Sequence, residues 1–357
     1  MPSYDSLQRT IQNIRQRRNT HYRIPTSTQD FIIPDEFKVT NRGIRFLLDD
    51  TQITGQRVII FSTDDALNIL SQTNSIFFDG TFSVVPDIFY QLFVLHGFIH
   101  GQIFPLVYVL MERKTKESYL IVWRKLQEYI TENLTSAMCD FEIASIQAFN
   151  ETFPQIPITG CYYHFCQSIY RGIQRFGLVT SYNESQNIRI HLRMLSALAF
   201  CPPQQVSNYY EILEDQLNTL LQSNSIRQFL DYFEETYIGR FRRTGRDEPR
   251  FPIVLWNQRL RVIDHLPRTN NNVEGWHRAF SSMVDASHPN IYTFLRHLKN
   301  EESLVSARIE RADSINVNDT RRERQRSIEN QLVTLISRFE ILPPLTFLKK
   351  IAFIYSF

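Results

Sequence analysis

Three apolar, aromatic runs follow one another in the middle of this sequence and are separated only by short turns. They cover residues 75–85, 88–99 and 103–111, and His100-Gly101-Gln102 closes the second run. Runs of this length, rich in Phe, Val, Ile and Tyr, are typical of strands, and the short turns between them predict an antiparallel meander. A chain with this stretch at its centre must build its core around a β-sheet.

Downstream of the meander, helical and strand-like patterns alternate. We expect a helix, a strand, a helix, a strand and a helix at residues 119–130, 137–140, 143–149, 157–163 and 165–176. The last two strands follow crossover helices and should therefore run parallel to the first strand. This element order is that of the ribonuclease-H-like fold, in which the first and fourth strands are neighbours. We predict an α/β protein with a ribonuclease-H-like mixed sheet flanked by helices.

Residues 179–264 interrupt this alternation. Helical stripes run from Tyr209 to Leu221 and from Phe229 to Tyr237, and they predict an all-helical insertion in the core. A length of 357 residues allows one large domain with such elaborations, or two domains. We predict five parts: an N-terminal helical and irregular region at 1–55, the first part of the core at 56–178, the insertion at 179–264, the final core helices at 265–312 and a C-terminal helical tail at 313–357.

Several helices are expected outside the alternating core. Residues 3–18 read as a polar helix, and further helices are expected at about 290–311 and 320–340. The apolar stretch at 345–357 should pack on the core. Hydrophobic residues make up 43% of the chain, which is ample for a sizeable core.

Net charge and cysteine usage indicate which partners and which cellular compartment to expect. The net charge is only +2, so global charge does not indicate a nucleic-acid partner. The four cysteines form no CxxC pair, and Cys139 and Cys161 lie in apolar runs as buried free thiols would, which favours a reducing compartment. The N-terminus has no apolar signal region, and no apolar run approaches the roughly 18 residues that span a bilayer. We expect a soluble, intracellular protein with no membrane partner.

Three separated carboxylates stand where buried elements begin or end. Asp79 lies within the first strand, in SIFFDGTFSV, and Asp140 follows the fourth strand, in TSAMCDFEIAS. Glu274 stands where a helix to about Met283 should begin, after Thr and Asn residues that favour helix N-caps. Two Mg²⁺ or Mn²⁺ ions take oxygen ligands and together can act on a phosphodiester. We expect Asp79 to bridge the two ions and Asp140 and Glu274 to flank them.

Each acid also has a structural interpretation. Asp79 could mark a strand bulge before Gly80, although an acid among Phe and Ile residues is costly unless it is paired or metal-bound. Asp140 could be the N-cap of the following helix, a role that is compatible with metal binding. Glu274 could interact with its helix dipole. Glu142 lies close to Asp140 and is a weaker candidate for the same flanking position.

A thiol and an imidazole stand at CxxH spacing in GCYYHFC, at Cys161 and His164. A zinc site would need two more ligands, and the nearby Cys166 is too close to His164 to complete an undistorted tetrahedral set. We therefore predict no structural zinc. Cys161 should be a buried thiol, and His164 should begin a helix and point towards the acids.

Two aromatic side chains follow Glu274 on its predicted helix. His277 lies three residues later, on the same face, and could reach a scissile phosphate or shuttle a proton. Trp276 could stack on an unpaired base, or it could be a partly buried packing residue.

Arginines are clustered rather than evenly spread. Arg gives planar, bidentate contacts to phosphate, although a solvated surface is the alternative interpretation. One cluster ends the insertion, in GRFRRTGRDEPR, and a second lies at residues 321–326. The residues predicted to contact DNA are Arg240, Arg242, Arg243, Arg246, Arg250, Trp276 and Arg278.

Taken in order, four segments resemble the Mutator-like element (MULE) transposases of the DDE type. They are DGTF at 79–82, CDFEIASIQAF at 139–149, GCYYHF at 160–165 and RTNNNVEGWHRAF at 268–280, and the resemblance spans roughly residues 60–300. The family's catalytic acids fall on Asp79, Asp140 and Glu274, and its CxxH motif on Cys161 and His164. All three acids are present.

This resemblance implies an enzyme that cuts and joins DNA strands with two Mg²⁺ or Mn²⁺ ions. Its substrates would be double-stranded DNA at the element ends and at the target, it would act in the nucleus, and it would work as a homodimer or a larger assembly. Many animal relatives carry a zinc-finger module ahead of the core, whereas the first 70 residues here contain no cysteine. Either the chain is a partial gene product, or DNA recognition lies in the N-terminal helix or a partner.

Two other functions are compatible with the same residues. One is a domesticated, non-catalytic DNA-binding regulator that keeps the fold, and the other is a plain nuclease of the ribonuclease-H-like class. The intact set of acids argues against the regulator. The helical insertion and the EGWH context favour the transposase over the nuclease.

Overall fold

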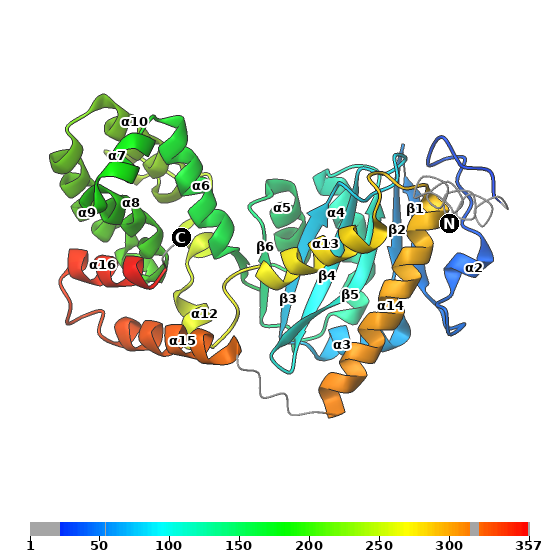
Figure 1. Cartoon of the computed structure of the whole chain (residues 1–357). Coiled ribbons are helices and arrows are strands. Elements are labelled where there is room, and N and C mark those ends of the chain that lie inside the picture. The colour runs from blue at the N-terminus through cyan, green and yellow to red at the C-terminus, as the bar shows by residue number, and fades with distance from the viewer. Residues whose placement is uncertain (1–21, 54, 315–320, 356–357) are drawn as a thin grey trace, which may run out of the picture. The chain divides into compact units, whose positions relative to one another are not determined.

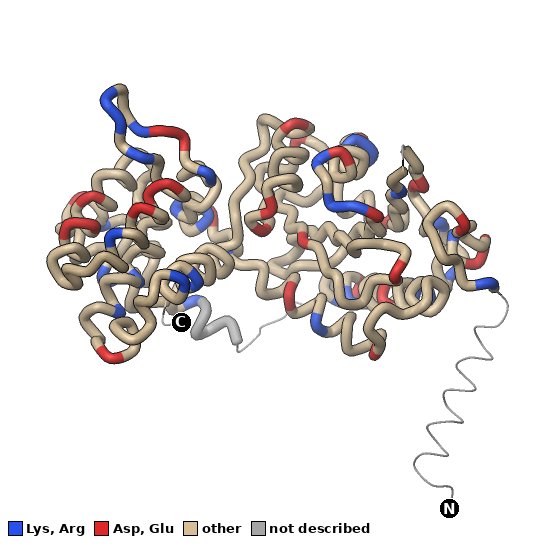
Figure 2. Tube along the Cα trace, turned by 90° about the horizontal axis from the view of Figure 1, so that it is seen from above, with Lys and Arg blue, Asp and Glu red and all other residues tan. Residues whose placement is uncertain are grey.

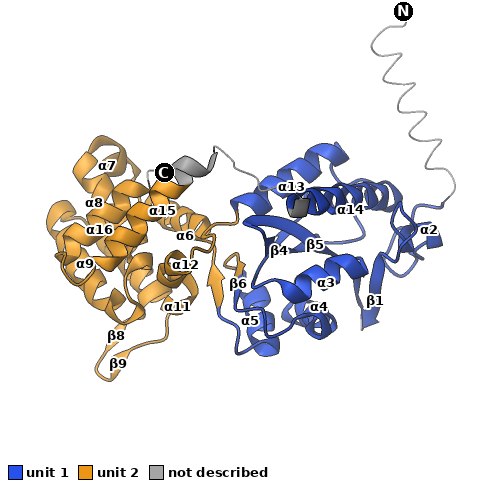
Figure 3. Ribbon diagram, turned by 90° about the horizontal axis from the view of Figure 1, so that it is seen from below, with its two compact units in different colours: residues 1–137, 142–157, 271–316 blue, residues 138–141, 158–270, 317–357 orange. Residues whose placement is uncertain are grey.

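The computed structural model describes residues 22–53, 55–314 and 321–355, the side chains of residues 313–325 excepted. The helix expected at residues 3–18 lies outside the described residues. The chain forms two compact units (Figure 3). Unit 1 comprises residues 1–137, 142–157 and 271–316, and unit 2 comprises residues 138–141, 158–270 and 317–357.

A seven-stranded sheet has the order β1-β2-β5-β4-β3-β6-β7 (Figure 1). Its strands are β1 (Leu47–Ile53), β2 (Gln56–Phe61), β3 (Ser75–Thr81), β4 (Gln91–Ile99), β5 (Gln102–Met111), β6 (Ser136–Cys139) and β7 (Ile158–Gly160). β3, β4 and β5 pair antiparallel, so the predicted meander is confirmed. β1 and β2 continue the antiparallel pairing onto β5. β3 and β6, the first and fourth of the predicted core strands, are neighbours.

The sheet of unit 1 is covered on both faces, which explains its apolar strands. All but the last two residues of β4 are buried, as are the first four residues of β3. Strands buried on both faces carry continuous apolar runs instead of alternating ones. Helices α13 (Asn271–Val284) and α14 (Ile291–Ser314) cross one face, and α4 (Lys116–Leu126) and α5 (Ile143–Thr152) lie on the other (Figure 1).

Aromatic residues form the core beneath α4 and α5. The Phe78 ring on β3 lies 4.9 Å from Trp123 of α4 and 5.5 Å from Phe149 of α5, between ring centroids. All three side chains are buried. Such edge-on and tilted ring pairs add to the free energy gained by area burial. This packing fixes the strand that carries Asp79 against two helices.

The remaining helices of unit 1 begin at recognisable signals. α3 (Asp64–Gln72) and α4 both have a threonine N-cap whose side chain accepts a backbone N–H, Thr63 and Thr115 respectively. Such caps satisfy one of the unpaired amides of the first turn. A short helix, α2 (Asp35–Lys38), precedes the sheet.

Helices dominate unit 2. They are α6 (Tyr162–Arg175), α7 (Val179–Glu184), α8 (Gln186–Ala197), α9 (Val206–Leu221), α10 (Asn224–Phe233), α11 (Ile253–Trp256), α12 (Arg259–Ile263), α15 (Arg321–Ser337) and α16 (Pro344–Ile354). α16 packs on α8 and buries Phe347, Leu348 and Ile351, which confirms that the apolar C-terminal stretch joins a core. No helix among the described residues is both long and apolar enough to cross a membrane.

The prediction that residues 179–264 are entirely helical is wrong at one place. Two short strands, β8 (Phe241–Arg242) and β9 (Gly245–Arg246), pair antiparallel as a hairpin. The turn residues Arg243 and Thr244 lead into Gly245, whose φ of +121° only glycine adopts readily. Gly239, with φ of +93°, ends the preceding π-helical turn in the same way. These two glycines stop the helix and start the hairpin.

Candidate active site

Asp79 lies near the end of β3, at the point where the strand leaves the core. It pairs with Val94 of β4, and Gly80 pairs with Phe93 without a register shift, so the interpretation of Asp79 as a bulge residue is wrong. The Oδ1 atom accepts the N–H of Gly80 at 2.7 Å. The side chain is 15% exposed, so this carboxylate is held at the rim of a buried surface.

Helix α13 brings a histidine to Asp79. Glu274 is the fourth residue of α13, as the sequence predicted, and its Oε1 atom is buried. His277 follows one turn later, and its Nε2 atom lies 3.4 Å from Oδ2 of Asp79. Residues three apart share a helix face, so Glu274 lies on the side of α13 that faces β3. Unit 1 thus brings together Asp79 and the Glu274–His277 face.

Trp276 is a packing residue, so the hypothesis that it stacks on an unpaired base is wrong. It is 7% exposed, its ring stacks on Phe280 at 5.1 Å, and its Nε1–H donates to Glu301 at 2.6 Å. A buried indole with a satisfied N–H cannot present its face to DNA. Its neighbour Arg278 is exposed.

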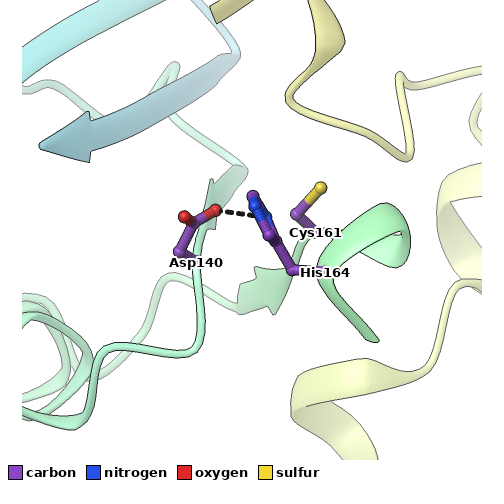
Figure 4. A group of neighbouring side chains, drawn as sticks. All are labelled: Asp140, Cys161 and His164. Atoms are coloured by element: carbon purple, nitrogen blue, oxygen red, sulfur yellow. Dashed lines mark ion pairs between the residues drawn. The ribbon is translucent and has the colours of Figure 1, made fainter. Parts of the chain in front are cut away.

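Asp140 follows β6 directly and belongs to unit 2. The Oδ1 atom lies 2.7 Å from Nδ1 of His164, which is in the first turn of α6 (Figure 4). The N-cap of α5 is Glu142, so Asp140 is not that helix's cap. Glu142 itself accepts a hydrogen bond from the Tyr119 hydroxyl at 3.0 Å. Burial, with the negative charge of Glu142, raises the pKa of Tyr119, so the phenol keeps the proton it donates.

The neighbours of His164 favour its protonated form. Burial lowers its pKa, but hydrogen bonds and charge from Asp140 and Cys161 outweigh burial and raise the pKa to about 11. The imidazolium therefore forms an ion pair with Asp140. Cys161 is fully buried at the N-cap position of α6, as expected for a free thiol.

Asn270 forms hydrogen bonds with both Asp140 and Cys161 within unit 2. Its Nδ2 donates to Oδ1 of Asp140 at 3.2 Å, and its backbone N–H donates to Sγ of Cys161 at 3.2 Å. The carbonyl of Arg268 accepts the N–H of Tyr162 at 2.9 Å. Sequence reasoning treated the TNNN run only as a cap signal and missed Asn270. The polar run before α13 was a signal that these side chains have specific partners.

Arg268 anchors the same segment to the C-terminal part of unit 2. Its Nη1 and Nη2 atoms contact the two carboxylate oxygens of Glu329, on α15, at 2.8 and 2.6 Å. Its Nε donates to the hydroxyl of Tyr355, just after α16, at 2.8 Å. The Arg268 side chain is only 5% exposed. The loop that leads into α13 is therefore fastened beside two C-terminal helices within unit 2.

The donor atoms of the three predicted acids suit a divalent metal. Mg²⁺ and Mn²⁺ take oxygen ligands, and the carboxylates of Asp79 and Glu274 in unit 1 fit that preference. Asp140 adds a third carboxylate from unit 2, so the residues present suit hard cations. The convergence of all three acids stays a prediction.

A second donor set surrounds Asp140. Oxygen, sulfur and nitrogen ligand atoms of Asp140, Cys161 and His164 all lie within 4.8 Å of one another (Figure 4). Such a mixed set suits Zn²⁺ better than Mg²⁺. Sequence reasoning found no further candidate ligand beside the CxxH pair, whereas the structure places a carboxylate oxygen of Asp140 there. The prediction of no structural zinc stays a prediction.

The arginines of the β8–β9 hairpin are largely paired with acids of unit 2. Arg240 contacts Glu235 at 2.7 Å and Arg242 contacts Asp247 at 2.8 Å. Arg246 contacts two acids, Glu211 at 2.7 Å and Glu234 at 2.6 Å. Basic and acidic residues are interspersed along the chain in Figure 2. Three of the five arginines predicted here to contact DNA are therefore already engaged.

Arg243 and Arg250 differ from the other three. Both are exposed, and neither has an ion pair among the described residues. Arg250 lies over the Phe251 ring at 5.5 Å. Of the second cluster, Arg326 is exposed, and the side chains of Arg321, Arg322 and Arg324 lie outside the described ones. Arg243, Arg250 and Arg278 are the predicted DNA contacts that remain available to phosphate.

A comparison with family models gives one match. Residues 75–168 match the MULE transposase domain, from the first residue of β3 into α6, and the matched segment includes Asp79, Asp140, Cys161 and His164. The chain therefore contains a transposase domain. This domain is of the MULE type, and the resemblance inferred from the motifs is confirmed. No curated protein matches the chain.

Proposed function

We propose that this protein is a DDE-type DNA transposase that cuts and joins DNA strands with divalent metal ions. The observation that carries the proposal is the position of two acids inside the MULE transposase domain. Asp79 lies on β3 and Asp140 directly follows β6, and these strands are neighbours in the sheet. The order of the five core strands supports a ribonuclease-H-like fold.

Asp79, Asp140 and Glu274 would hold the ions. Two bound Mg²⁺ or Mn²⁺ ions would activate the attacking hydroxyl and stabilise the leaving oxygen of the phosphodiester. Asp79 suits the bridging position because it stands on a strand packed between helices. Asp140 and Glu274 suit the flanking positions.

The two histidines act as positioning residues in this proposal. His277 contacts Asp79 at 3.4 Å and His164 contacts Asp140 at 2.7 Å, so each aspartate has an imidazole that restricts its rotamer. Carboxylates whose outer partners are fixed hold a better defined geometry for their ligands. Replacing either histidine should weaken activity more than it weakens DNA binding.

Contact with the DNA backbone falls to the exposed arginines. Arg243, Arg250 and Arg278 are exposed, and none of them has an ion pair among the described residues, so they can reach phosphate freely. Replacing all three with Gln should lower affinity evenly across DNA sequences and reduce the salt slope by about one unit per lost contact. An unchanged slope would assign these arginines to the solvated surface.

The proposal includes the setting in which the enzyme works. It would act in the nucleus on double-stranded DNA at element ends and targets, and as a homodimer. Microscopy of the tagged full chain tests the first point. Light scattering with and without DNA tests the second, and a single chain in both states would contradict it.

A cleavage assay tests the activity. The full chain is incubated with Mg²⁺ or Mn²⁺ and DNA that carries the terminal repeats flanking its coding sequence. We expect cut ends and joined products from the parent, and neither from Asp79→Asn. Asp65→Asn, an exposed acid on α3, is the matched control and should cut as the parent does.

The products separate the competing functions. Cutting without joining would favour a plain nuclease. Binding without cutting, in both metals, would favour a DNA-binding regulator. Equal cutting by Asp79→Asn and the parent would refute the assignment of Asp79.

A further inference from the structure

Unit 2 contains a pocket that the proposed reaction does not use. It has a volume of about 390 Å³ and lies between α6, α7 and α8. Tyrosines from two of these helices line it: Tyr163 and Tyr170 from α6, and Tyr182 from α7. Pockets of this size hold small organic ligands and have mostly apolar walls with a few polar groups.

The tyrosine rings that line the pocket indicate that a flat, planar ligand would fit it. Tyr163 and Tyr170 are seven residues apart, so they lie two turns apart on one face of α6. The Tyr170 and Tyr182 rings meet edge to face at 5.5 Å. Tyr170 is 37% exposed, so part of its surface is open to a ligand. Exposed tyrosine rings can stack on a planar partner.

Polar groups give the pocket a means of recognition. Gln167 lies between the two tyrosines on the same face of α6, and its carboxamide has no hydrogen-bond partner among the described residues. A carboxamide offers donors and an acceptor side by side, which suits the edge of a nucleobase. Arg193, which also donates to the carbonyl of Tyr355, adds a positive charge to the wall. No Asp or Glu is among the described residues that line the pocket.

The pocket starts beside the ion pair of the candidate active site. Tyr163 directly precedes His164, and their rings lie 5.5 Å apart. His164 in turn contacts Asp140 at 2.7 Å. All of these residues belong to unit 2. A ligand seated in the pocket would therefore lie close to Asp140.

We propose that this pocket binds one unpaired nucleobase of the DNA substrate. The inference rests on the proposed function, because it takes DNA to be the substrate. The base would stack on tyrosine, Gln167 would bond to its edge, and Arg193 would face the adjoining phosphate. Proteins that turn a base out of the helix receive it in pockets of this chemistry, with aromatic or apolar walls and hydrogen bonds to the base edge.

The test measures binding without metal, so that no cutting is needed. Full-length protein in EDTA is titrated with two duplexes of the same sequence, one fully paired and one with a single unpaired 2-aminopurine. We expect about tenfold tighter binding to the second, in line with the effect of stacking one base on an aromatic ring. The fluorescence of 2-aminopurine should fall as it stacks.

Variants then assign the effect to the pocket. Tyr170→Ala should abolish the preference and the quenching, whereas Tyr170→Phe should keep both. Gln167→Ala should change which base is preferred. Tyr90→Ala is the matched control, because Tyr90 is an exposed tyrosine, 47% exposed, in unit 1. Thermal unfolding of each variant checks that it is folded.

The outcomes are distinguishable. Equal affinity for both duplexes would overturn the proposal that this pocket binds a base. A preference that survives Tyr170→Ala in a folded variant would overturn it as well. Neither result would bear on the proposed transposase activity. A protein that binds neither duplex overturns both. Loss of the preference in Tyr90→Ala would place the base elsewhere and would also overturn the pocket.

Discussion

The backbone N–H of Asn270 donates a hydrogen bond to the Sγ atom of Cys161 at 3.2 Å, although 109 residues separate them. The Asn270 side chain donates to Asp140 as well. One fully buried residue therefore joins three motifs within unit 2: the acid after β6, the CxxH start of α6 and the polar segment before α13. The geometry of Asp140 depends on that segment.

Asn270→Ala should lower both stability and activity. It removes the Asn270 hydrogen bond to Oδ1 of Asp140, an atom that His164 still contacts, and losing a hydrogen bond to a charged group costs about 1.5–3 kcal/mol in unfolding free energy. Asn270→Asp should be worse, because it places a second negative charge 3.2 Å from Asp140. Urea unfolding measures both variants. Asn272→Ala, an exposed neighbour, should unfold like the parent, and equal stability of all four proteins would contradict the role of Asn270.

Arg268 and Glu329 form the second anchor of this segment. Glu329→Ala should reduce the unfolding free energy by about 3 kcal/mol, because it leaves a buried guanidinium without its bidentate partner. Guanidinium chloride unfolding would be confounded by its own salt, so urea is the denaturant to use. Glu340→Ala removes an exposed acid that follows α15 and serves as the control. A loss below about 1 kcal/mol would place this pair among weak surface ion pairs.

Local pattern predicted much of this fold. The meander, the crossover helices and the placement of Asp79 and Glu274 followed from apolar runs and cap residues, which act over a few neighbouring residues. The β8–β9 hairpin did not, because two-residue strands carry too little pattern. Gly245 was the local signal that could have revealed it.

Contacts between residues far apart in the sequence explain why Trp276 and Arg246 were wrongly predicted to be free to contact DNA. Trp276 follows Glu274 in the sequence, but it is buried by residues such as Glu301 on α14, which no local pattern identifies. Arg246 likewise meets Glu211, 35 residues away. Whether a basic or aromatic residue is free to bind DNA depends on such partners. Sequence alone therefore predicted the elements that carry Asp79 and Glu274 better than it predicted the surface around them.

Glu214 predicts a pH dependence of stability. Burial, with the charge of Glu234, raises the pKa of Glu214 to about 6 from 4.5. The folded state therefore binds a proton that the unfolded state releases between pH 4.5 and 6. This contribution to stability is fully present below pH 4.5 and is lost as pH rises through 6.

Glu214→Gln should therefore stabilise the protein above pH 6 and change little below pH 4.5. Melting temperatures of parent and variant across roughly pH 4–8 give the comparison. Glu184→Gln, an exposed acid on α7, controls for a general change in charge. A constant difference between parent and Glu214→Gln at every pH would show that titration of Glu214 is not the cause.

Metal removal tests the CxxH pair. We expect chelators to leave the melting temperature unchanged, because a structural zinc takes four protein ligands and this cluster of described residues offers Asp140, Cys161 and His164. Elemental analysis of the purified protein should show less than one zinc per chain. Stoichiometric zinc, lost together with thermal stability on chelation, would assign a structural zinc to these residues.

Gly160 lies where a side chain would displace Phe141. A Cβ atom there would stand 2.5 Å from Cζ of the Phe141 ring, closer than real contacts allow. Phe141 directly follows Asp140, so the displaced ring should shift that acid as well as strain the core. Gly160→Ala should therefore cost about 1–3 kcal/mol in stability, the usual range for overpacking.

Replacing Phe141 with a smaller side chain should relieve the clash with a Cβ atom at position 160. In Gly160→Ala/Phe141→Leu, the aromatic ring that met the new methyl group is gone, so the double variant should be more stable than the sum of the single effects predicts. Neighbouring residues that share a contact show such coupling, about 0.5–3 kcal/mol in double-mutant cycles. Urea unfolding of the four proteins measures it, and strand cleavage by the same four shows whether Asp140 regains its position. Strictly additive effects would mean that the backbone of β7 moves instead of Phe141, and that Gly160 does not control the acid.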